Sequence, residues 1–452
     1  MSALMVSVSG IRGIIGDSFT PDVIIGYLQA YTNVVGKGTI YVGRDPRPHG
    51  EMVENIVCGT LLSLGCKVVK LGITPTPTVE IMVANRQAAG GIIITASHNP
   101  PQWNALKFIN GKGMFLEKDV VNQVIKRFNE GWKEPLAPWD GVPLPETDSS
   151  SIALHLQKIL AVPFIDKEAI RRRTFTVVVD CNHGVGGVMA RQLLEELGCT
   201  VIALGETPDG KFEHPCEPVP AHLGMLCEAV KRENADVGFA IDPDGDRVAI
   251  VSEQGIAIGE EYTLAIGTSC ILSRKKGPIT VNLSTSRMSE DIAIANGCQC
   301  FRAPVGEINV ASAMKQNGSV VGGEGNGGVM IPEVHTCRDA FGGMALCLQF
   351  LVDRNASISA AVTQLPSYCM KKETAQLGSI DADALLKEIE RRYSEAKADW
   401  RDGLHLSWSD KWLHVRKSNT ERILRIIAES KTAEETKRLI ESVRGLIPGN
   451  NQ

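Results

Sequence analysis

Several sequence features are missing from this 452-residue chain, and each absence excludes a class of protein. No apolar run reaches the roughly 18 residues of a membrane helix, and the N-terminus shows no basic stretch followed by an apolar one. The net charge of −5 leaves no overall basic field for nucleic acid. The 12 cysteines form no Cys-x-x-Cys pair. We therefore expect a cytoplasmic protein with reduced, buried thiols and with neither a nucleic-acid nor a membrane partner.

A strand–helix–strand arrangement recurs three times along the chain. The copies begin near residues 39, 175 and 279, and a glycine follows each helix, at Gly65, Gly198 and Gly297. Units of this kind give parallel strands joined by right-handed crossovers. The pattern predicts three related α/β layers, although strand–helix–glycine–strand is also common enough to recur by chance.

The C-terminal part has a different pattern. We expect helices at 382–398 and 433–444, with strands at 404–408 and 412–416 and an apolar run at 423–428. This mixture predicts a small α+β domain with an antiparallel sheet. We place linkers near 143–150, 253–260 and 366–375 and divide the chain into domains of residues 1–148, 149–255, 256–367 and 368–452.

The segment Thr95–Pro100 carries the most informative hydroxyl group. It reads Thr-Ala-Ser-His-Asn-Pro and follows the apolar run 91–94, which is typical of a buried strand. Reacting groups collect where strands of α/β proteins end, so Ser97 is a candidate nucleophile. A Ser97–His98 hydrolase is disfavoured, because adjacent residues do not normally face each other and the Gly-x-Ser-x-Gly elbow is missing. His98 stays a catalytic candidate as a member of the same loop.

Three alternate aspartates form the second informative motif. Asp242, Asp244 and Asp246 follow the apolar run 237–241, so their carboxylates can converge at a strand end. Such a cluster is strongly repulsive without a cation, and hard cations such as Mg²⁺ prefer oxygen ligands. A calcium loop is disfavoured because the strand-like run 248–251 interrupts it. A solvated acidic turn is the remaining alternative.

Other polar residues indicate an anionic, hydroxylated ligand. Arg12 lies between two glycines, which allow a close approach of backbone to ligand, and arginine suits phosphate. Lys107 could serve as a base if buried near cations. Glu324 and Asn326 stand in a glycine-rich segment and suit sugar hydroxyls. The run 416–420 offers a cation, hydroxyls, an amide and backbone N–H groups, which together suit a phosphate. Each of these four sites also has a purely structural alternative. Arg12 could lie in a surface turn and Lys107 could be an ordinary solvated lysine. The glycine-rich segment could be a flexible turn, and the run 416–420 could cap a helix.

In this order the motifs resemble those of one family, the α-D-phosphohexomutases, which act on phosphorylated glucose, mannose, glucosamine and acetylglucosamine. The resemblance covers essentially the whole chain. The segment 95–100 looks like the phosphoserine loop, 242–247 like the metal loop, 323–328 like the sugar loop and 416–420 like the phosphate loop. The resemblance implies four domains around a central cleft, three related α/β domains and one C-terminal α+β domain.

The resemblance also implies a role for each candidate residue. Ser97 would be the phosphorylated nucleophile, and its phosphate would share one Mg²⁺ with Asp242, Asp244 and Asp246. The other implied contacts are Arg12, Lys107 as a candidate general base and Arg247 at the transferring phosphoryl group, Glu324 and Asn326 at the sugar, and Arg416, Ser418, Asn419 and Thr420 at the other phosphate.

The implied reaction interconverts hexose 6-phosphate and hexose 1-phosphate through a hexose 1,6-bisphosphate, which is both intermediate and activator. The implied partner is a phosphosugar, and the implied assembly is a monomer or a homodimer. A non-catalytic sugar-phosphate binding protein and a metal-dependent phosphatase are alternatives of other classes. Intact Ser97, Lys107 and aspartates disfavour the binding protein.

Two departures from the family pattern bear on the sugar. Many relatives have Gly-Glu-x-Ser-Gly-His in the sugar loop. Here Asn326 stands in place of that serine and Gly328 in place of that histidine. Glu307 stands where phosphomannomutase/phosphoglucomutase enzymes often have histidine, and an acid could pair with the ammonium of glucosamine phosphate. We favour a phosphoglucosamine mutase, with a phosphomannomutase/phosphoglucomutase as the alternative.

Overall fold

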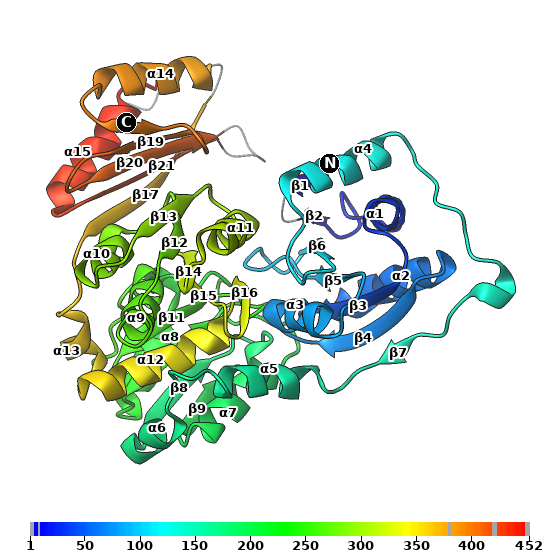
Figure 1. The fold of residues 1–452 in the computed structure, drawn as a ribbon, viewed down its shortest axis with the longest axis horizontal. Helices are drawn as coiled ribbons and strands as arrows, with labels where there is room; N and C mark the ends of the chain where they lie inside the picture. The colour runs from blue at the N-terminus through cyan, green and yellow to red at the C-terminus, as the bar shows by residue number, and fades with distance from the viewer. Residues whose placement is uncertain (1–3, 8–9, 378–380, 418–422, 448–452) are drawn as a thin grey trace.

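The computed structural model describes residues 4–7, 10–377, 381–417 and 423–447. Within these residues the strands form four sheets, and we number the domains I to IV after them (Figure 1). No helix in the described part of the chain is long and apolar enough to cross a membrane.

Domain I is built on a seven-stranded sheet of order β1-β2-β6-β5-β3-β4-β7. Its strands are β1 (Met5–Ser7), β2 (Gly10–Ile14), β3 (Thr39–Arg44), β4 (Lys67–Ile73), β5 (Gly90–Ile94), β6 (Trp103–Asn110) and β7 (Glu146–Thr147). Its helices are α1 (Pro21–Val35), α2 (Gly50–Ser63), α3 (Thr76–Asn85) and α4 (Lys118–Asn129), followed by a 3-10 turn at Trp139–Gly141. Every residue of β5 is buried, which agrees with its unbroken apolar sequence.

Domains II and III follow with four and five strands. Domain II contains α5 (Ser151–Leu160), α6 (Lys167–Arg173), β8 (Thr176–Asp180), α7 (Gly186–Glu196), β9 (Thr200–Leu204), a 3-10 turn at Pro220–His222, α8 (Gly224–Arg232), β10 (Val237–Ile241) and β11 (Val248–Ser252). Domain III contains α9 (Glu261–Leu272), β12 (Ile279–Asn282), α10 (Arg287–Ala295), β13 (Cys300–Ala303), α11 (Glu307–Asn317), β14 (Val321–Glu324), β15 (Gly328–Ile331), β16 (His335–Arg338), α12 (Ala340–Arg354) and α13 (Ile358–Val362).

The three α/β domains repeat one strand order, which confirms the predicted relationship. The shared orders are β4-β3-β5-β6, β9-β8-β10-β11 and β13-β12-β14-β15. In each, the first three strands are parallel and the fourth returns antiparallel as a hairpin. The hairpin loops β5–β6, β10–β11 and β14–β15 are therefore equivalent positions of the three repeats.

Domain IV has an antiparallel sheet of order β17-β21-β20-β19-β18, as predicted. Its elements are β17 (Cys369–Gln376), α14 (Ala382–Arg392), β18 (Lys397–Asp399), β19 (Leu404–Ser407), β20 (Trp412–Lys417), β21 (Ile423–Ser430) and α15 (Ala433–Arg444).

Two predictions for this domain were wrong. The helix expected at 382–398 ends at Arg392, because 397–399 instead hydrogen-bonds to β19 as β18. The linker expected at 366–375 largely forms β17, whose charged sequence pairs along its whole length with β21.

The apolar cores decide how the domains are joined. Domains II and III share one core, in which α12 is almost entirely buried. Domain IV has a core of its own, as does one face of the domain I sheet. In Figure 1 the blue domain I lies at the right and the orange and red domain IV at the upper left. A further core joins the other face of the domain I sheet and α3 to α11 of domain III. Because apolar burial dominates folding free energy, these cores hold domains I, II and III together, whereas the core of domain IV contains residues of that domain alone.

Candidate active site

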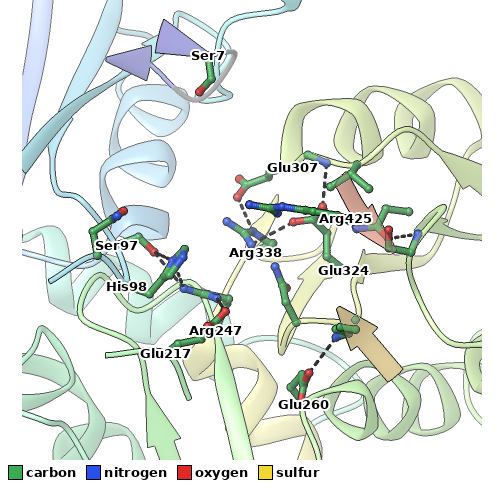
Figure 2. A pocket seen from close by; sticks show the side chains of 18 of the residues that line it. Ser7, Ser97, His98, Glu217, Arg247, Glu260, Glu307, Glu324, Arg338 and Arg425 are labelled. Atoms are coloured by element: carbon green, nitrogen blue, oxygen red, sulfur yellow. Dashed lines mark hydrogen bonds and ion pairs between the residues drawn. The ribbon is translucent and has the colours of Figure 1, made fainter. Parts of the chain in front are cut away.

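All four domains contribute residues to one cleft of about 1000 Å³. Figure 2 shows Ser97 and His98 from domain I, Arg247 from domain II, Glu307, Glu324 and Arg338 from domain III, and Arg425 from domain IV. The volume suits a small polar ligand such as a sugar phosphate. The β5–β6 loop carries Ser97, the β10–β11 loop carries the three aspartates, and Glu324 is the last residue of β14 before the third hairpin loop. The repeat therefore brings Ser97 and Glu324 to the cleft and places Asp242 within hydrogen-bonding distance of Ser97.

The Ser97 loop is held in a strained conformation. Ser97 has φ +48°, a left-handed value that costs non-glycine residues free energy and persists only where the surroundings impose it. Arg47 imposes it: its Nη2 donates to the carbonyls of Ser97 at 2.8 Å and Asn99 at 2.6 Å. Its Nη1 donates to the carbonyl of Pro100 at 2.7 Å. Its Nε donates to Asp45 at 3.0 Å. Sequence analysis missed Arg47, although it lies in the first strand–loop–helix copy.

The Ser97 hydroxyl lies between opposite charges. Its Oγ donates to Asp242 Oδ2 at 3.2 Å and accepts from Arg247 Nη2 at 3.1 Å. Arg247 Nη2 also donates to His98 Nδ1 at 2.9 Å. Burial and the neighbouring Arg247 lower the pKa of His98 to about 2. His98 is therefore neutral, and the nitrogen nearest Ser97 already accepts a hydrogen bond.

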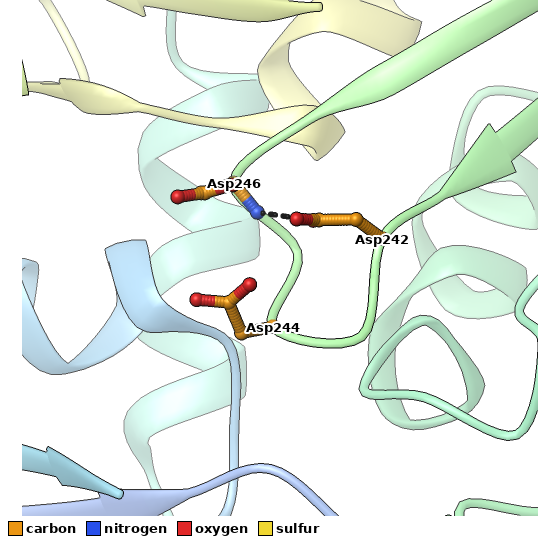
Figure 3. A group of neighbouring side chains, drawn as sticks. All are labelled: Asp242, Asp244 and Asp246. Atoms are coloured by element: carbon orange, nitrogen blue, oxygen red, sulfur yellow. Dashed lines mark hydrogen bonds between the residues drawn. The ribbon is translucent and has the colours of Figure 1, made fainter. Parts of the chain in front are cut away.

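The three aspartates converge as predicted (Figure 3). Each is at most 1% exposed, and one oxygen of each lies within 4.8 Å of the others. Asp242 Oδ1 accepts from the backbone N–H of Asp246 at 3.1 Å and of Arg247 at 3.2 Å, which fixes the loop. Asp244 Oδ1 and Asp246 Oδ1 are buried without a hydrogen-bond partner. Asp246 Oδ1 still lies 3.4 Å from Arg247 Nε, whereas no hydrogen bond or ion pair to the described residues is made by Asp244 Oδ1. Buried carboxylate oxygens without hydrogen bonds fit a divalent cation with oxygen ligands.

The aspartates shift one another's pKa values, and neighbouring cations offset part of their charge. Burial and the charges of Asp246 and Asp244 raise the pKa of Asp242 well above its ordinary value. Burial would also raise the pKa of Asp244, but Lys107 outweighs it and lowers that pKa. Lys107 Nζ lies 2.6 Å from Asp244 Oδ2. Burial lowers the pKa of Lys107, yet Asp244 and Asp246 raise it overall, so Lys107 is protonated in this arrangement.

Arg338 joins the metal loop to the sugar residues. Its Nη2 pairs with Asp246, its Nε with Glu307 at 2.9 Å and its Nη1 with Glu324 at 3.1 Å. Glu324 Oε1 also accepts from Asn282 at 2.8 Å. Burial raises the pKa of Glu307 to about 7 even beside Arg338. No motif in the sequence pointed to Arg338, because its three partners are 14 to 92 residues away.

The remaining predicted residues occupy the rim and the domain IV wall. Arg12 donates to Asn99, and Asn326 lines the cleft with a buried, unpartnered Oδ1. Arg416 lines it from domain IV, 3.4 Å from Asp402. Ser418, Asn419 and Thr420 lie outside the described residues.

Arg425, which sequence analysis missed, stands directly opposite Arg416 on the neighbouring strand. Both guanidinium groups belong to residues that line the cleft. Like charges opposite each other in a sheet are unfavourable, and a bound anion would relieve them.

Family models match all three α/β domains. They are described as phosphoglucomutase/phosphomannomutase alpha/beta/alpha domains I, II and III, and they match residues 4–134, 153–255 and 259–368. The chain belongs to the α-D-phosphohexomutase family. A phosphohexomutase is an isomerase that moves a phosphoryl group between two hydroxyls of a hexose. The four-domain architecture inferred from the sequence is confirmed with it.

Individual phosphohexomutases resemble the chain over nearly its full length. A probable phosphoglucosamine mutase of Methanopyrus kandleri is 33% identical over 435 residues, which cover 95% of each chain. A phosphoglucomutase/phosphomannomutase of Thermococcus kodakarensis is also 33% identical, over 96% of each chain. The crystal structure of a putative phosphomannomutase from Thermus thermophilus superposes with a TM-score of 0.84 at 24% identity, covering 99% of this chain and all of that one. These relatives carry different sugar names, so they share the reaction class with this chain and leave the sugar open.

Proposed function

We propose that this phosphohexomutase interconverts glucosamine 6-phosphate and glucosamine 1-phosphate through phosphorylated Ser97. The observation that carries the phosphoserine route is the place of the Ser97 hydroxyl, between Asp242 and Arg247 at the floor of a cleft that all four domains line. Phosphoryl transfer needs positioning and charge neutralisation more than covalent chemistry, and this surrounding supplies both.

The two transfers are the reverse of each other. In the first, the P–O bond to Ser97 breaks as a sugar hydroxyl oxygen bonds to phosphorus, which yields the 1,6-bisphosphate. The hydroxyl gives its proton to a base, for which Lys107 is the candidate, and the leaving Ser97 oxygen takes up a proton and becomes a hydroxyl again. The bisphosphate turns over in the cleft, and its other phosphoryl group returns to Ser97. Arg247, 3.1 Å from Ser97 Oγ, would hold the transferring group in both steps.

Asp242, Asp244 and Asp246, together with an oxygen of the Ser97 phosphate, would hold one Mg²⁺, which supplies further positive charge at that phosphate. Cation binding would also compete with Lys107 for Asp244 and lower the pKa of the lysine, which a role as general base requires.

Domain IV would hold the phosphate that is not transferred. Arg416 and Arg425 line the cleft from adjacent strands, and the predicted loop residues 418–420 begin two residues after Arg416. Because the stationary phosphate sits on a separately folded domain, its binding would also bring domain IV over the reacting groups and exclude water from them.

The carboxylates around Arg338 favour glucosamine as the sugar of the substrate. Glu307 and Glu324 share the cation of Arg338, whereas Asp246 also lies 3.4 Å from Arg247 Nε and 3.9 Å from Lys107 Nζ. The two glutamates therefore have one cation between them, and this side of the cleft can accommodate a further positive charge. An ammonium group on the sugar would supply that charge, whereas the hydroxyl of glucose or mannose would not. The 33% identity to a probable phosphoglucosamine mutase agrees with this choice, but a phosphoglucomutase/phosphomannomutase is equally similar.

The test is a substrate panel with catalytic bisphosphate supplied. The proposal expects the highest kcat/KM with glucosamine phosphate among the 1- and 6-phosphates of glucose, mannose, glucosamine and acetylglucosamine. Glu307→Gln should reduce the preference for glucosamine 6-phosphate over glucose 6-phosphate; an unchanged ratio would remove the ammonium argument. Release of free phosphate without isomerisation would instead indicate a phosphatase.

A further inference from the structure

Arg338 has no role in the function described so far beyond its charge. We propose that Arg338 is a positioning residue that fixes the metal loop and the two sugar-facing carboxylates relative to one another. The inference deepens the proposed function, since it concerns how the same cleft orders its metal and its sugar.

The contacts of Arg338 use the whole guanidinium group. Each of its three nitrogens meets a carboxylate from a different segment: Asp246 in the β10–β11 loop, Glu307 at the start of α11 and Glu324 at the end of β14. Figure 2 shows Arg338 between the two glutamates. Arginine alone among side chains offers donors in such a planar fork, and lysine has a single charged nitrogen.

Arg338 and its three carboxylate partners are largely buried, which strengthens the ion pairs between them. The Arg338 side chain is 13% exposed, and the carboxylates are 0 to 5% exposed. Charges held away from water interact strongly and cost much free energy when a partner is lost. Loss of the guanidinium would leave Glu307 without an ion-pair partner among the described residues and Glu324 with the N–H groups of Asn282 and Gly306 alone.

The backbone of Arg338 is anchored from the opposite side. Successive residues of a strand point to opposite faces, so Asp339 faces away from the cleft when Arg338 faces it. Asp339 caps α12 by accepting from the backbone N–H of Phe341 at 2.9 Å, and it pairs with His155 Nε2 at 3.0 Å. His155 Nδ1 lies 2.8 Å from the hydroxyl of Thr78. Asp339, His155 and Thr78 are each at most 2% exposed, so residues of three domains hold this strand end in place.

The Arg338 side chain passes close to the backbone of Gly328, where only a glycine leaves room for it. A Cβ atom at Gly328 would lie 2.4 Å from Cδ of Arg338, so any larger residue there would displace the arginine. Gly328 and Arg338 are therefore two parts of one arrangement.

The test separates positioning from folding by measuring two affinities. Arg338→Met removes the charge, and Arg338→Lys keeps it without the fork. Mn²⁺ binding is measured by calorimetry without sugar, and binding of glucosamine 6-phosphate and glucose 6-phosphate is measured on dephosphorylated enzyme. Arg274→Lys is the control, because it changes a surface arginine of domain III that pairs with Asp353 far from the cleft residues.

The expected changes have opposite signs. Arg338→Met should bind Mn²⁺ about threefold to tenfold more tightly, because a positive charge beside Asp246 is gone. Both Arg338 variants should bind the sugar phosphates about tenfold to a hundredfold more weakly, because Glu307 and Glu324 lose charged hydrogen bonds that orient them. Arg338→Lys should bind Mn²⁺ nearly as wild type does, and Arg274→Lys should match wild type in both.

A general loss of structure would weaken both affinities together and would overturn the proposal, as would unchanged sugar binding in Arg338→Lys or unchanged Mn²⁺ binding in Arg338→Met. If the wild type bound and isomerised neither sugar phosphate, the proposed function would fail, and the Mn²⁺ comparison would still decide the role of Arg338 at the metal loop.

Discussion

The buried pair of Arg47 and Asp45 offers a direct test of how the nucleophile is positioned. Both side chains are inaccessible to solvent, and Arg47 Nε donates to Asp45 Oδ2 at 3.0 Å. Arg47→Met preserves much of the side-chain volume but leaves the Asp45 carboxylate without its cation. It also leaves the carbonyls of Ser97 and Asn99 without their donor.

The expected loss of stability follows from these contacts. Breaking a buried ion pair by removing one partner costs about 3–5 kcal/mol, because the remaining charge is uncompensated. Burial already raises the pKa of Asp45 in the intact protein, so Asp45 would take up a proton in the variant and offset part of that cost. We therefore expect Arg47→Met to lower the free energy of unfolding of domain I by about 3 kcal/mol, and Asp45→Asn in the same chain to restore part of it.

Arg47→Met should also slow phosphorylation of Ser97 in the molecules that remain folded. Without Arg47 the left-handed conformation of Ser97 keeps only local contacts, such as the hydrogen bond of 2.9 Å from its N–H to Thr95 Oγ1. A misplacement of about 1 Å can slow a reaction about a hundredfold. The assay is the rate at which glucose 1,6-bisphosphate phosphorylates Ser97, followed by intact mass, beside urea unfolding. Arg44→Met is the matched control, since Arg44 ends β3 three residues before Arg47 but pairs with Glu54 at 3.2 Å. Phosphorylation at the wild-type rate in folded Arg47→Met would refute the reasoning.

Of three further predictions, two concern the cleft, and the third concerns His214 in domain II. Ser97→Ala should abolish isomerisation while circular dichroism stays unchanged; residual turnover above background would exclude Ser97 as the carrier. Mg²⁺ or Mn²⁺ should raise the thermal midpoint of the wild type but not of Asp244→Asn, and chelation should stop isomerisation; equal shifts in both proteins would place the metal elsewhere. Burial lowers the pKa of His214, but hydrogen bonding and charge from Asp180 raise it overall. The stability from this contact is therefore complete below the ordinary imidazole pKa and is lost as pH rises through the raised one. Between about pH 6 and 8 the midpoint of the wild type should fall relative to that of His214→Gln, and parallel curves would contradict this.

The sequence predicted those parts of the fold that depend on neighbouring residues. The helix expected at 433–444 agrees with α15, and the strands at 404–408 and 412–416 with β19 and β20, because periodicity and glycine positions are local signals. Residues 397–399 were misread as helix, since their strand exists only through hydrogen bonds to β19. Charge obscured β17 in the same way, because its partner β21 begins 47 residues after it ends.

The sequence by itself determined where the candidate reacting groups stand: a hydroxyl and three carboxylates, in loops that each follow a buried apolar strand. Only the tertiary structure decided how they act together. The repeated hairpin places loops 145 residues apart within hydrogen-bonding distance, as between Ser97 and Asp242. It also recruited Arg47 and Arg338, whose partners lie up to 56 and 92 residues away. The physical reason is that a strand end is set by local pattern, whereas the charge facing it across a buried cleft is set by packing.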